Sequence, residues 1–393
     1  MFCQSLLQSL LFSPFLPLLL LSSPAATTAQ KLEESTFKLK ESAYNPYIAT
    51  LSQLLPKASV LDVLASTNHD MVAEDVRAIG MNYKATRWEN SASFNDFGTT
   101  SWYPQGISTS ADAYDVGTYE GKHVTLVSWY DNRDVPNAEN KGVRIAFVDR
   151  DKSPDAYRYV LLVEPYSNAG TVDFRAVKVH SGGIAWYGNS LYIVDTDKGF
   201  RVFDLTQIWK VETGDGIGRK NGGGFSAANY AYVLPQSRTY TSTSPSTPGW
   251  PVRFSFVSLD RTTTPDSLLV GEYQPASFTG PRRFIRWSID YTNRQLTTDS
   301  AGVATATWAY QVNIDRMQGV NSVNGKFYIS RSNGGSNGDL ISWTPGNLAK
   351  IASGAVLEGP EDLSYDKTTG LMYTVTEAIN GRYILPFDPT VLL

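Results

Sequence analysis

Short apolar runs separated by polar turns recur along most of the chain. The stretch IDRMQGVNSVNGKFYISRSNGGSNGDLISWTP (314–345) shows the pattern. One run follows Gln318-Gly319, a tight Asn324-Gly325 turn leads to a second run, and a polar segment leads to a third. Alternating or β-branched apolar runs joined by Asn-Gly and similar pairs are typical of β-hairpins. The pattern therefore predicts three antiparallel strands in this stretch.

The same pattern of three strands occurs five times. When the copies are aligned on their first strand, five positions fall in register: Gly106, Gly183, Phe256, Gly319 and Asp362. A fourth strand is predicted after each of the first four copies, in YVLLVEP, YAYVLPQ, TWAYQVN and AKIAS. Four-stranded units repeated in one order predict an all-β fold, a β-propeller. We expect five blades, with six as the alternative count and an open β-sandwich as the alternative architecture.

The fifth copy shows no fourth strand after its third. The segment NYKATRW (82–88), just before the first copy, is strand-like, and we expect it to complete the last blade. Closure of this kind removes exposed sheet edges. Upstream, the stretch 58–80 has helical spacing and ends in Gly80, which is typical of a helix terminus. The predicted organisation is a helical N-terminal arm over 30–80 and a propeller domain over 81–393.

The first 29 residues are uncharged and rich in leucine, and they end in small residues. This composition predicts a secretory signal peptide cleaved after Ala29, and hence a secreted protein. A membrane anchor is the alternative, but three prolines interrupt the apolar run, so we expect no stable membrane insertion. The only cysteine, Cys3, lies in this segment. The mature protein is thus expected to depend on its core without disulfides.

Charge and histidine content narrow the possible partners. The 393 residues carry a formal net charge of -4 and no evident basic patch, which argues against nucleic-acid binding. There are three histidines, His69, His123 and His180, so metal sites built from several histidines are disfavoured. We expect a monomer whose partner is a small-molecule ligand.

In a propeller the first strand of each blade lines the central axis. The residues just before the aligned positions should therefore form one polar ring: Gln105, Gly182, Ser255, Gln318 and Glu361. Turns between the second and third strands should surround it with Tyr130, Asp131, Arg133, Asp195, Asp197, Glu272, Arg331, Asn333 and Glu377. A narrow polar well with a charged rim is a candidate small-ligand site. The alternative is that the ring residues bond to one another and to trapped water, and so only plug the axis.

The strand triplets over residues 81 to 393 resemble secreted propellers that include lactonases of the SMP-30/gluconolactonase type and strictosidine-synthase-like enzymes. In these lactonases, Glu, Asn and Asp side chains at the first-strand entries hold a metal on the axis. The matching positions here offer one carboxylate, Glu361, together with amides. This is a poor set for a divalent cation. A metal-dependent lactonase-like hydrolase is therefore kept as an alternative, and no cofactor is expected.

Three strings, HSGGIAWYGNSLYIVDT, MQGVNSVNGKFYISRSNGG and GPEDLSYD, resemble secreted propeller proteins of fungi and actinomycetes. That group includes a protein of fungal trichothecene toxin clusters. The resemblance implies a role in sesquiterpenoid mycotoxin biosynthesis and in virulence, by an acid-assisted cyclisation.

Acid chemistry of this kind needs a shaped pocket and a proton donor. Glu361 is the candidate acid, because burial in a narrow well raises the pKa of a carboxyl group and keeps it protonated. His180 is the second candidate acid or base. Candidate substrate-binding residues are Gln105, Gln318, Ser255, Trp102, Tyr103, Tyr130 and Arg331. A non-catalytic binding protein or lectin is the further alternative.

Overall fold

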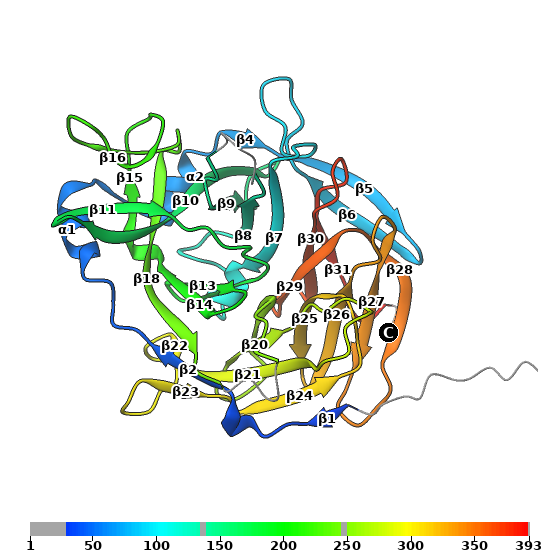
Figure 1. The fold of residues 1–393 in the computed structure, drawn as a ribbon. Helices are drawn as coiled ribbons and strands as arrows, with labels where there is room; N and C mark the ends of the chain where they lie inside the picture. The colour runs from blue at the N-terminus through cyan, green and yellow to red at the C-terminus, as the bar shows by residue number, and fades with distance from the viewer. Residues whose placement is uncertain (1–28, 134–138, 245–249, 392–393) are drawn as a thin grey trace, which may run out of the picture.

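Strands dominate the computed structural model, which describes residues 29–133, 139–244 and 250–391 (Figure 1). The predicted signal peptide with Cys3 lies outside these residues, apart from Ala29. The strands are grouped around a central axis, and the fold is the all-β propeller that the sequence predicts.

Five antiparallel units, each of four strands, surround the axis. The first two units contain β7 (Trp102–Thr109), β8 (Val124–Asp131), β9 (Val143–Asp149), β10 (Ala156–Asn168), and then β12 (Ile184–Tyr187), β13 (Ser190–Asp195), β14 (Gly199–Asp204), β18 (Tyr232–Ser242). The next two contain β19 (Phe256–Asp260), β20 (Ser267–Gly271), β21 (Arg282–Asp290), β24 (Trp308–Val312), and then β25 (Met317–Val323), β26 (Lys326–Arg331), β27 (Asn337–Trp343), β28 (Lys350–Glu358). The last contains β29 (Pro360–Asp366), β30 (Leu371–Thr376), β31 (Tyr383–Phe387) and β6 (Met81–Arg87).

The innermost strands form a closed ring in the order β7, β12, β19, β25, β29 and back to β7. Glycines at the aligned positions let these strands approach closely. A Cβ on Gly106 would lie 2.7 Å from the backbone nitrogen of Ile184, and a Cβ on Gly183 would lie 2.4 Å from that of Val257. The recurring glycine at the strand entry is therefore a packing requirement of the axis.

Apolar side chains fill the spaces between neighbouring units. Separate core clusters lie between the first and second, second and third, third and fourth, fourth and fifth, and fifth and first units. Trp186, Trp287 and Trp343 are buried in three of them, at the interfaces between units. Each unit thus buries both faces, and the chain of interfaces returns to its start.

The last unit takes its outer strand from the N-terminal part of the chain. β6 pairs with β31 in antiparallel register, Ile384 opposite Thr86, and β5 (Val72–Ala78) then extends the same sheet beyond β6. Chain segments from both ends of the described residues are therefore joined in one sheet.

The expectation of a helical arm over 30–80 is wrong for most of that segment. Two short α-helices are present, α1 (Tyr47–Leu54) and α2 (Val60–Ala65), whereas residues 72–78 form β5. The apolar residues of 72–78 follow the helical spacing of the stretch before them. In the structure, however, Val76 packs on the core between the last two units, and β6 supplies the backbone partners of β5. Gly80 has φ of 73° and turns the β5–β6 hairpin, where a helix end had been expected.

The rest of the N-terminal segment runs along the outside of the propeller (Figure 1). β1 (Gln30–Lys31) pairs with β24, β2 (Lys38–Glu41) lies between β18 and β23 (Val303–Thr305), and β3 (Lys57–Ala58) pairs with β15 (Ile208–Lys210). β10 and β18 are themselves paired in parallel, so the outer edges of the first two units are covered. The remaining short elements are η1 (Glu34–Thr36), β4 (His69–Asp70), α3 (Ser110–Ala113), β11 (Thr171–Ala176), η2 (Leu205–Gln207), β16 (Ile217–Arg219), β17 (Phe225–Ala227) and β22 (Gln295–Leu296).

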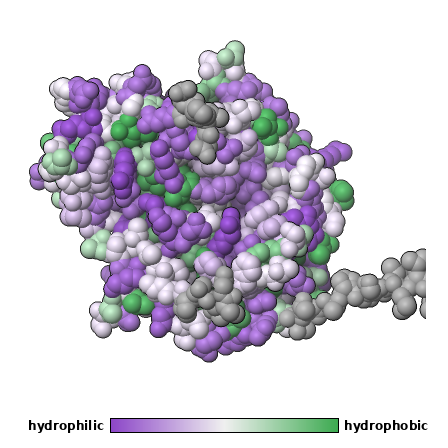
Figure 2. Space-filling model, viewed as in Figure 1, coloured by the Kyte–Doolittle hydropathy of each residue, from purple (hydrophilic) through white to green (hydrophobic). Residues whose placement is uncertain are grey.

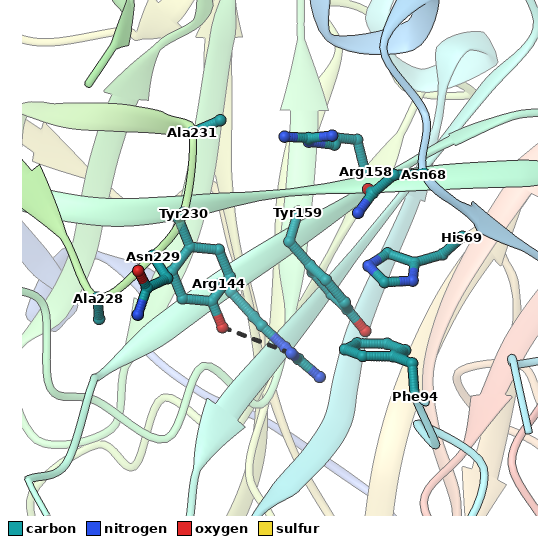
Figure 3. A pocket seen from close by; sticks show the side chains of 10 residues that line it. All are labelled: Asn68, His69, Phe94, Arg144, Arg158, Tyr159, Ala228, Asn229, Tyr230 and Ala231. Carbon is teal, nitrogen blue, oxygen red and sulfur yellow. Dashed lines mark hydrogen bonds between the residues drawn. The ribbon is translucent and has the colours of Figure 1, made fainter. Parts of the chain in front are cut away.

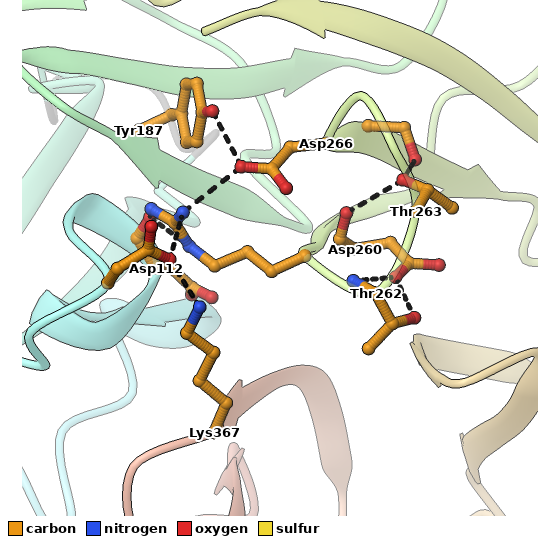
Figure 4. A network of polar contacts seen from close by, with 10 residues as sticks. Asp112, Tyr187, Asp260, Thr262, Thr263, Asp266 and Lys367 are labelled. Atoms are coloured by element: carbon orange, nitrogen blue, oxygen red, sulfur yellow. Dashed lines mark hydrogen bonds and ion pairs between the residues drawn. The ribbon is translucent and has the colours of Figure 1, made fainter.

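A polar network links three units at the C-terminal ends of their first strands (Figure 4). Arg261, after β19, donates to the backbone carbonyl of Asp112 in α3 and pairs with Asp115 and Asp266. Lys367, after β29, also pairs with Asp115. Three units are thereby linked at this end of the axis.

Candidate functional site

A polar pocket of about 280 Å³ opens where the first strands enter the axis. In the view of Figure 2, hydrophilic residues predominate around the centre of the face shown. The lining residues come from all five units: Gln105, Tyr130, His180, Gly182, Thr196, Arg253, Ser255, Tyr273, Gln318, Glu361 and Glu377. The structure therefore brings the five predicted ring positions together in one pocket, along with Tyr130, His180 and Glu377.

Glu361 is buried at the floor of this pocket, with 2% of its surface exposed. Burial raises the pKa of its carboxyl group well above the usual value, and the negative charges of Glu377 and Asp362 raise it further. The amide nitrogen of Gln318 donates to Glu361 Oε1 at 3.2 Å. The surroundings of Glu361 therefore favour the neutral form of its carboxyl group.

Glu377 is the partner of Glu361 in a pair of carboxyl groups. The two side chains share a hydrogen bond, which raises the pKa of Glu361 and opposes the effect of burial on the pKa of Glu377. Gln105 Nε2 donates to Glu377 Oε2 at 2.7 Å, and the charge of Arg382 also favours the ionised form of Glu377. Burial still leaves the pKa of Glu377 above its usual value, but these influences act on Glu377 alone and therefore favour the shared proton on Glu361.

The corresponding carboxylates in other units are neutralised by arginine. Asp131 pairs with Arg133, Asp195 with Arg201 at 2.9 Å, and Glu272 with Arg283 at 2.7 Å.

Within the described residues, Glu377 has no such ion pair, and its carboxylate is directed to Gln105 and Glu361 instead. The fifth unit thus lacks the arginine–carboxylate ion pair that the first three units have at this position. Unpaired buried carboxyl groups are costly and are often found where chemistry requires them.

His180 and Arg253 lie at the mouth of the pocket. Both residues are exposed. Desolvation against the pocket wall, and then the charge of Arg253, lower the pKa of the His180 imidazole. The imidazole ring lies 4.4 Å from the ring of Tyr130. His180 is therefore neutral at neutral pH, and Arg253 supplies a positive charge to the pocket entrance.

Three residues predicted to bind substrate do not line the pocket. Trp102 is buried, and its ring lies beneath the guanidinium of Arg144. Arg331 pairs with Asp339 and Asp315. Tyr103 lies one step behind the wall, because its ring stacks on Tyr130 at 5.8 Å.

Sequence reasoning did not select Thr196, Arg253 and Tyr273, which also line the pocket. Arg253 and Tyr273 lie close in sequence to Ser255 and Glu272, two positions that the repeat alignment placed near the axis. Their closeness in sequence to these two positions could have identified Arg253 and Tyr273, although the alignment of the first strands did not include them.

Asp362 lies directly below the floor of the pocket and is fully buried. Its Oδ2 accepts the backbone N–H of Ile184 at 3.0 Å and that of Ile107 at 3.4 Å, so the carboxyl group reaches across the axis to two other units. Burial raises its pKa well above the usual value. Asp362 therefore links the fifth unit to the first and second units beneath the pocket.

The donors present at the floor do not fit a divalent cation. Gln105 and Gln318 turn amide nitrogens, not oxygens, toward the two carboxyl groups, and Glu361 and Glu377 bond to each other. A hard cation requires several oxygen ligands around one centre. Among the described residues, no group of three His, Cys, Asp or Glu side chains is arranged to hold a metal ion.

No protein-family model and no curated protein matches this chain. Among solved structures it is similar to hydrazine synthase of Kuenenia stuttgartiensis, with 10% identity, 73% of this chain and 77% of that chain covered, and a TM-score of 0.34. It is also similar to the Cps50 (Swd1) β-propeller domain of Myceliophteria thermophila, with 9% identity, 74% and 97% covered, and a TM-score of 0.34. At these scores neither likeness bears on function. In the described part of the chain, no helix has the length and apolar character needed to span a membrane.

Proposed function

We propose that the axial pocket binds a small oxygen-bearing metabolite and that Glu361 donates a proton to it. The observation that carries this proposal is the hydrogen-bonded pair of carboxyl groups, Glu361 and Glu377, at the floor of an accessible pocket, where burial raises both pKa values and their hydrogen bond raises that of Glu361 further. Two neighbouring carboxyl groups whose pKa values are driven apart are a recurring arrangement in acid–base catalysis.

The remaining polar groups can position the ligand. Gln105 and Gln318 fix the two carboxyl groups from either side. Arg253 can attract electron-rich oxygen at the entrance, and Tyr130 supplies a flat wall. The polar lining indicates a ligand that carries several oxygens.

An acid-assisted cyclisation is the reaction that we propose within this frame. Glu361 protonates an epoxide oxygen and the C–O bond breaks. A hydroxyl group of the same molecule then forms a new C–O bond at that carbon, and its proton returns to the carboxyl pair. The product is an isomer of the substrate, so the step needs no oxidant or cofactor. The resemblance to a trichothecene-cluster protein points to sesquiterpenoid toxins as the substrate class.

The experiment is an isomerisation assay with a panel of epoxy-alcohol sesquiterpenoids, read by mass spectrometry as a new retention time at unchanged mass. We expect the wild-type protein and the Glu358→Gln control, at an exposed site on β28, to convert a panel member. Glu361→Gln should be slower by about a hundredfold or more, as expected for loss of a general acid. Full activity in folded Glu361→Gln, or no conversion by the wild-type protein, would refute the proposal.

A binding role without catalysis is the second candidate. The observation in its favour is the aromatic wall, in which Tyr130 lines the pocket and Tyr103 stacks behind it. Aromatic faces of this kind also bind sugars. A glycan-array hit that Glu361→Gln leaves unchanged would favour this role over proton transfer.

We also propose that the protein is secreted after cleavage of residues 1–29. The mature N-terminus should then lie at Gln30, and thiol labelling of the purified secreted protein should give no signal, because Cys3 is the only cysteine. A labelled mature protein would contradict cleavage at this point.

A further inference from the structure

A pocket of about 390 Å³ lies at the outer edge of the third unit, where the N-terminal segment runs along β24. Its lining comes from four parts of the chain: the segment around η1, the loop before β19, the loop between β20 and β21 with the start of β21, and β24. None of its lining residues belongs to the axial pocket. The pocket is therefore a separate candidate site.

An exposed tryptophan, Trp250, lines this pocket, with 42% of its surface accessible. All nine tryptophans of the chain lie in the described residues, and the others are buried or half-buried. Tryptophan supplies a large flat apolar face and is enriched where proteins contact ligands and partners. The indole of Trp250 is thus available for contact with a molecule from outside the chain.

The surroundings hold Trp250 in one position. The buried guanidinium of Arg283 donates to the backbone carbonyls of Trp250 and Pro251, at 3.3 and 2.9 Å. The ring of Phe278 packs edge-on against the indole, with ring centres 4.8 Å apart. Gly280 makes room for both rings, since a Cβ there would lie 2.5 Å from Phe278 Cζ and 3.0 Å from Trp250 Cδ2. A surface that is already ordered loses little freedom when a ligand binds.

The other walls of the pocket are fixed by strand register and by the core. Gln311 on β24 lies opposite Arg283 on β21, and directly opposed residues of an antiparallel pair lie on the same face of the sheet. Phe37 is buried, and it packs with Leu32 on the core between the second and third units. The pocket thus has an apolar base with polar groups around it.

Several of these polar groups have no partner in the protein. Among the described residues, no hydrogen bond is made by the indole Nε1 of Trp250, the side-chain amide of Gln311 or the hydroxyl of Thr279. The carboxylate of Glu33 accepts only from Ser35, through Oε1. The pocket therefore offers both donors and acceptors beside an aromatic face. Hydroxyl groups match such a set, because each one can donate and accept.

The charges at the pocket disfavour an anionic ligand. Arg283 is neutralised by Glu272, at 2.7 Å, whereas Glu33 has no ion pair within the described part of the chain. A quaternary ammonium ion could use Trp250 and Glu33, but it would leave Gln311 without a partner. A neutral molecule with an apolar face and an edge of hydroxyl groups uses all of these groups.

We propose that this pocket binds a neutral saccharide of one or two rings. The apolar C–H face of one ring stacks on the indole of Trp250. Hydroxyl groups at the edge of that ring bond to Gln311, Thr279 and Glu33. The volume lies in the range of small-molecule sites. The proposal does not depend on the function of the axial pocket.

The test is calorimetric titration with a panel of neutral disaccharides: cellobiose, maltose, lactose and N,N′-diacetylchitobiose. We expect at least one of them to bind with a Kd on the order of 1 mM or tighter, which is typical of a fragment-sized ligand. Choline and cyclohexanol should bind at least about fivefold more weakly than that disaccharide, because each carries one hydroxyl group only.

Trp250→Ala should weaken disaccharide binding at least about tenfold, since it removes the stacking face. Gln311→Ala should weaken it about threefold to tenfold. Tyr291→Ala is the matched control, because this tyrosine is an exposed aromatic residue of the same unit, with 55% of its surface accessible, and does not line the pocket. A melting curve like that of wild type shows that each variant is folded.

Tyr130→Ala, in the axial pocket, should leave disaccharide binding unchanged. Binding that is lost in Tyr130→Ala but kept in Trp250→Ala would assign the sugar to the axial pocket and overturn the proposal. It would also be overturned if no disaccharide bound, if choline or cyclohexanol bound as tightly, or if Tyr291→Ala weakened binding as much as Trp250→Ala.

Discussion

Replacing Glu361 by glutamine should change how the stability of the protein depends on pH. Burial and the neighbouring carboxylates raise the pKa of Glu361 well above its usual value of 4.5. Above pH 4.5 the unfolded chain releases this proton, whereas the folded protein retains it up to the raised pKa. Unfolding then releases a proton, so the free energy of unfolding falls as pH rises through this window.

The size of this change in unfolding free energy is set by the release of one proton on unfolding. Each pH unit between the unfolded and folded pKa values lowers the free energy of unfolding by about 1.4 kcal/mol. Glutamine cannot titrate, and its amide can imitate the neutral acid. Its nitrogen can donate to Glu377, and its oxygen can accept from Gln318, as the Glu361 carboxyl does. Glu361→Gln should therefore fold and should become more stable than wild type as pH rises.

The assay is urea unfolding, followed by tryptophan fluorescence in steps of pH from about 4 to 8, a range that brackets the usual carboxyl and imidazole pKa values. The wild-type curve minus the Glu361→Gln curve should fall by about 1.4 kcal/mol per pH unit and level off at the folded-state pKa. The exposed control Glu358→Gln should run parallel to wild type. A Glu361→Gln curve that also runs parallel to wild type would refute a raised pKa at this position.

Three further predictions test the scaffold. Gly183→Ala places a Cβ 2.4 Å from the backbone nitrogen of Val257, so it should lower the free energy of unfolding by at least about 1–3 kcal/mol, while Gly335→Ala, with no atom nearer than 3.8 Å, should not. Deleting residues 81–90 removes β6 from its pairing with β31 and should abolish the cooperative melt; an unchanged melt would mean that the last sheet does not need this strand. Burial raises the pKa of Asp112 to about 6 from 3.8, so Asp112→Asn should flatten the loss of stability between pH 4 and 6, measured by the same urea titrations.

The axial site could be located from sequence because the chain repeats one unit, so residues at the same position in each repeat occupy equivalent places around the axis. Once the first strands are aligned, Gln105, Gly182, Ser255, Gln318 and Glu361 must lie at the same level of the ring. The recurring glycines lie next to these ring positions, where the backbones of neighbouring first strands approach too closely to leave room for a Cβ atom. Sequence alone could not show that Glu377 bonds to Glu361, since that depends on how a turn from the second strand bends over the axis.

Other features depend on contacts that no local pattern records. The segment 72–78 has helical spacing, yet pairing with β6 makes it a strand. Arg331 was expected at the axial pocket, but the nearby carboxylates of Asp315 and Asp339 hold it. A hollow on the outer part of the first unit is lined by residues as distant in sequence as Asn68, Tyr159 and Asn229, so only the folded chain brings them together (Figure 3).

The protonation state of Glu361 is the central claim, and infrared difference spectroscopy measures it directly. Spectra of wild type minus Glu361→Gln, recorded at neutral pH, should contain the carbonyl stretch of a protonated carboxylic acid. That band should disappear as pH rises past the raised pKa of Glu361. A difference spectrum that shows only ionised carboxylate at neutral pH would contradict the account, because Glu361 would then have no proton to donate.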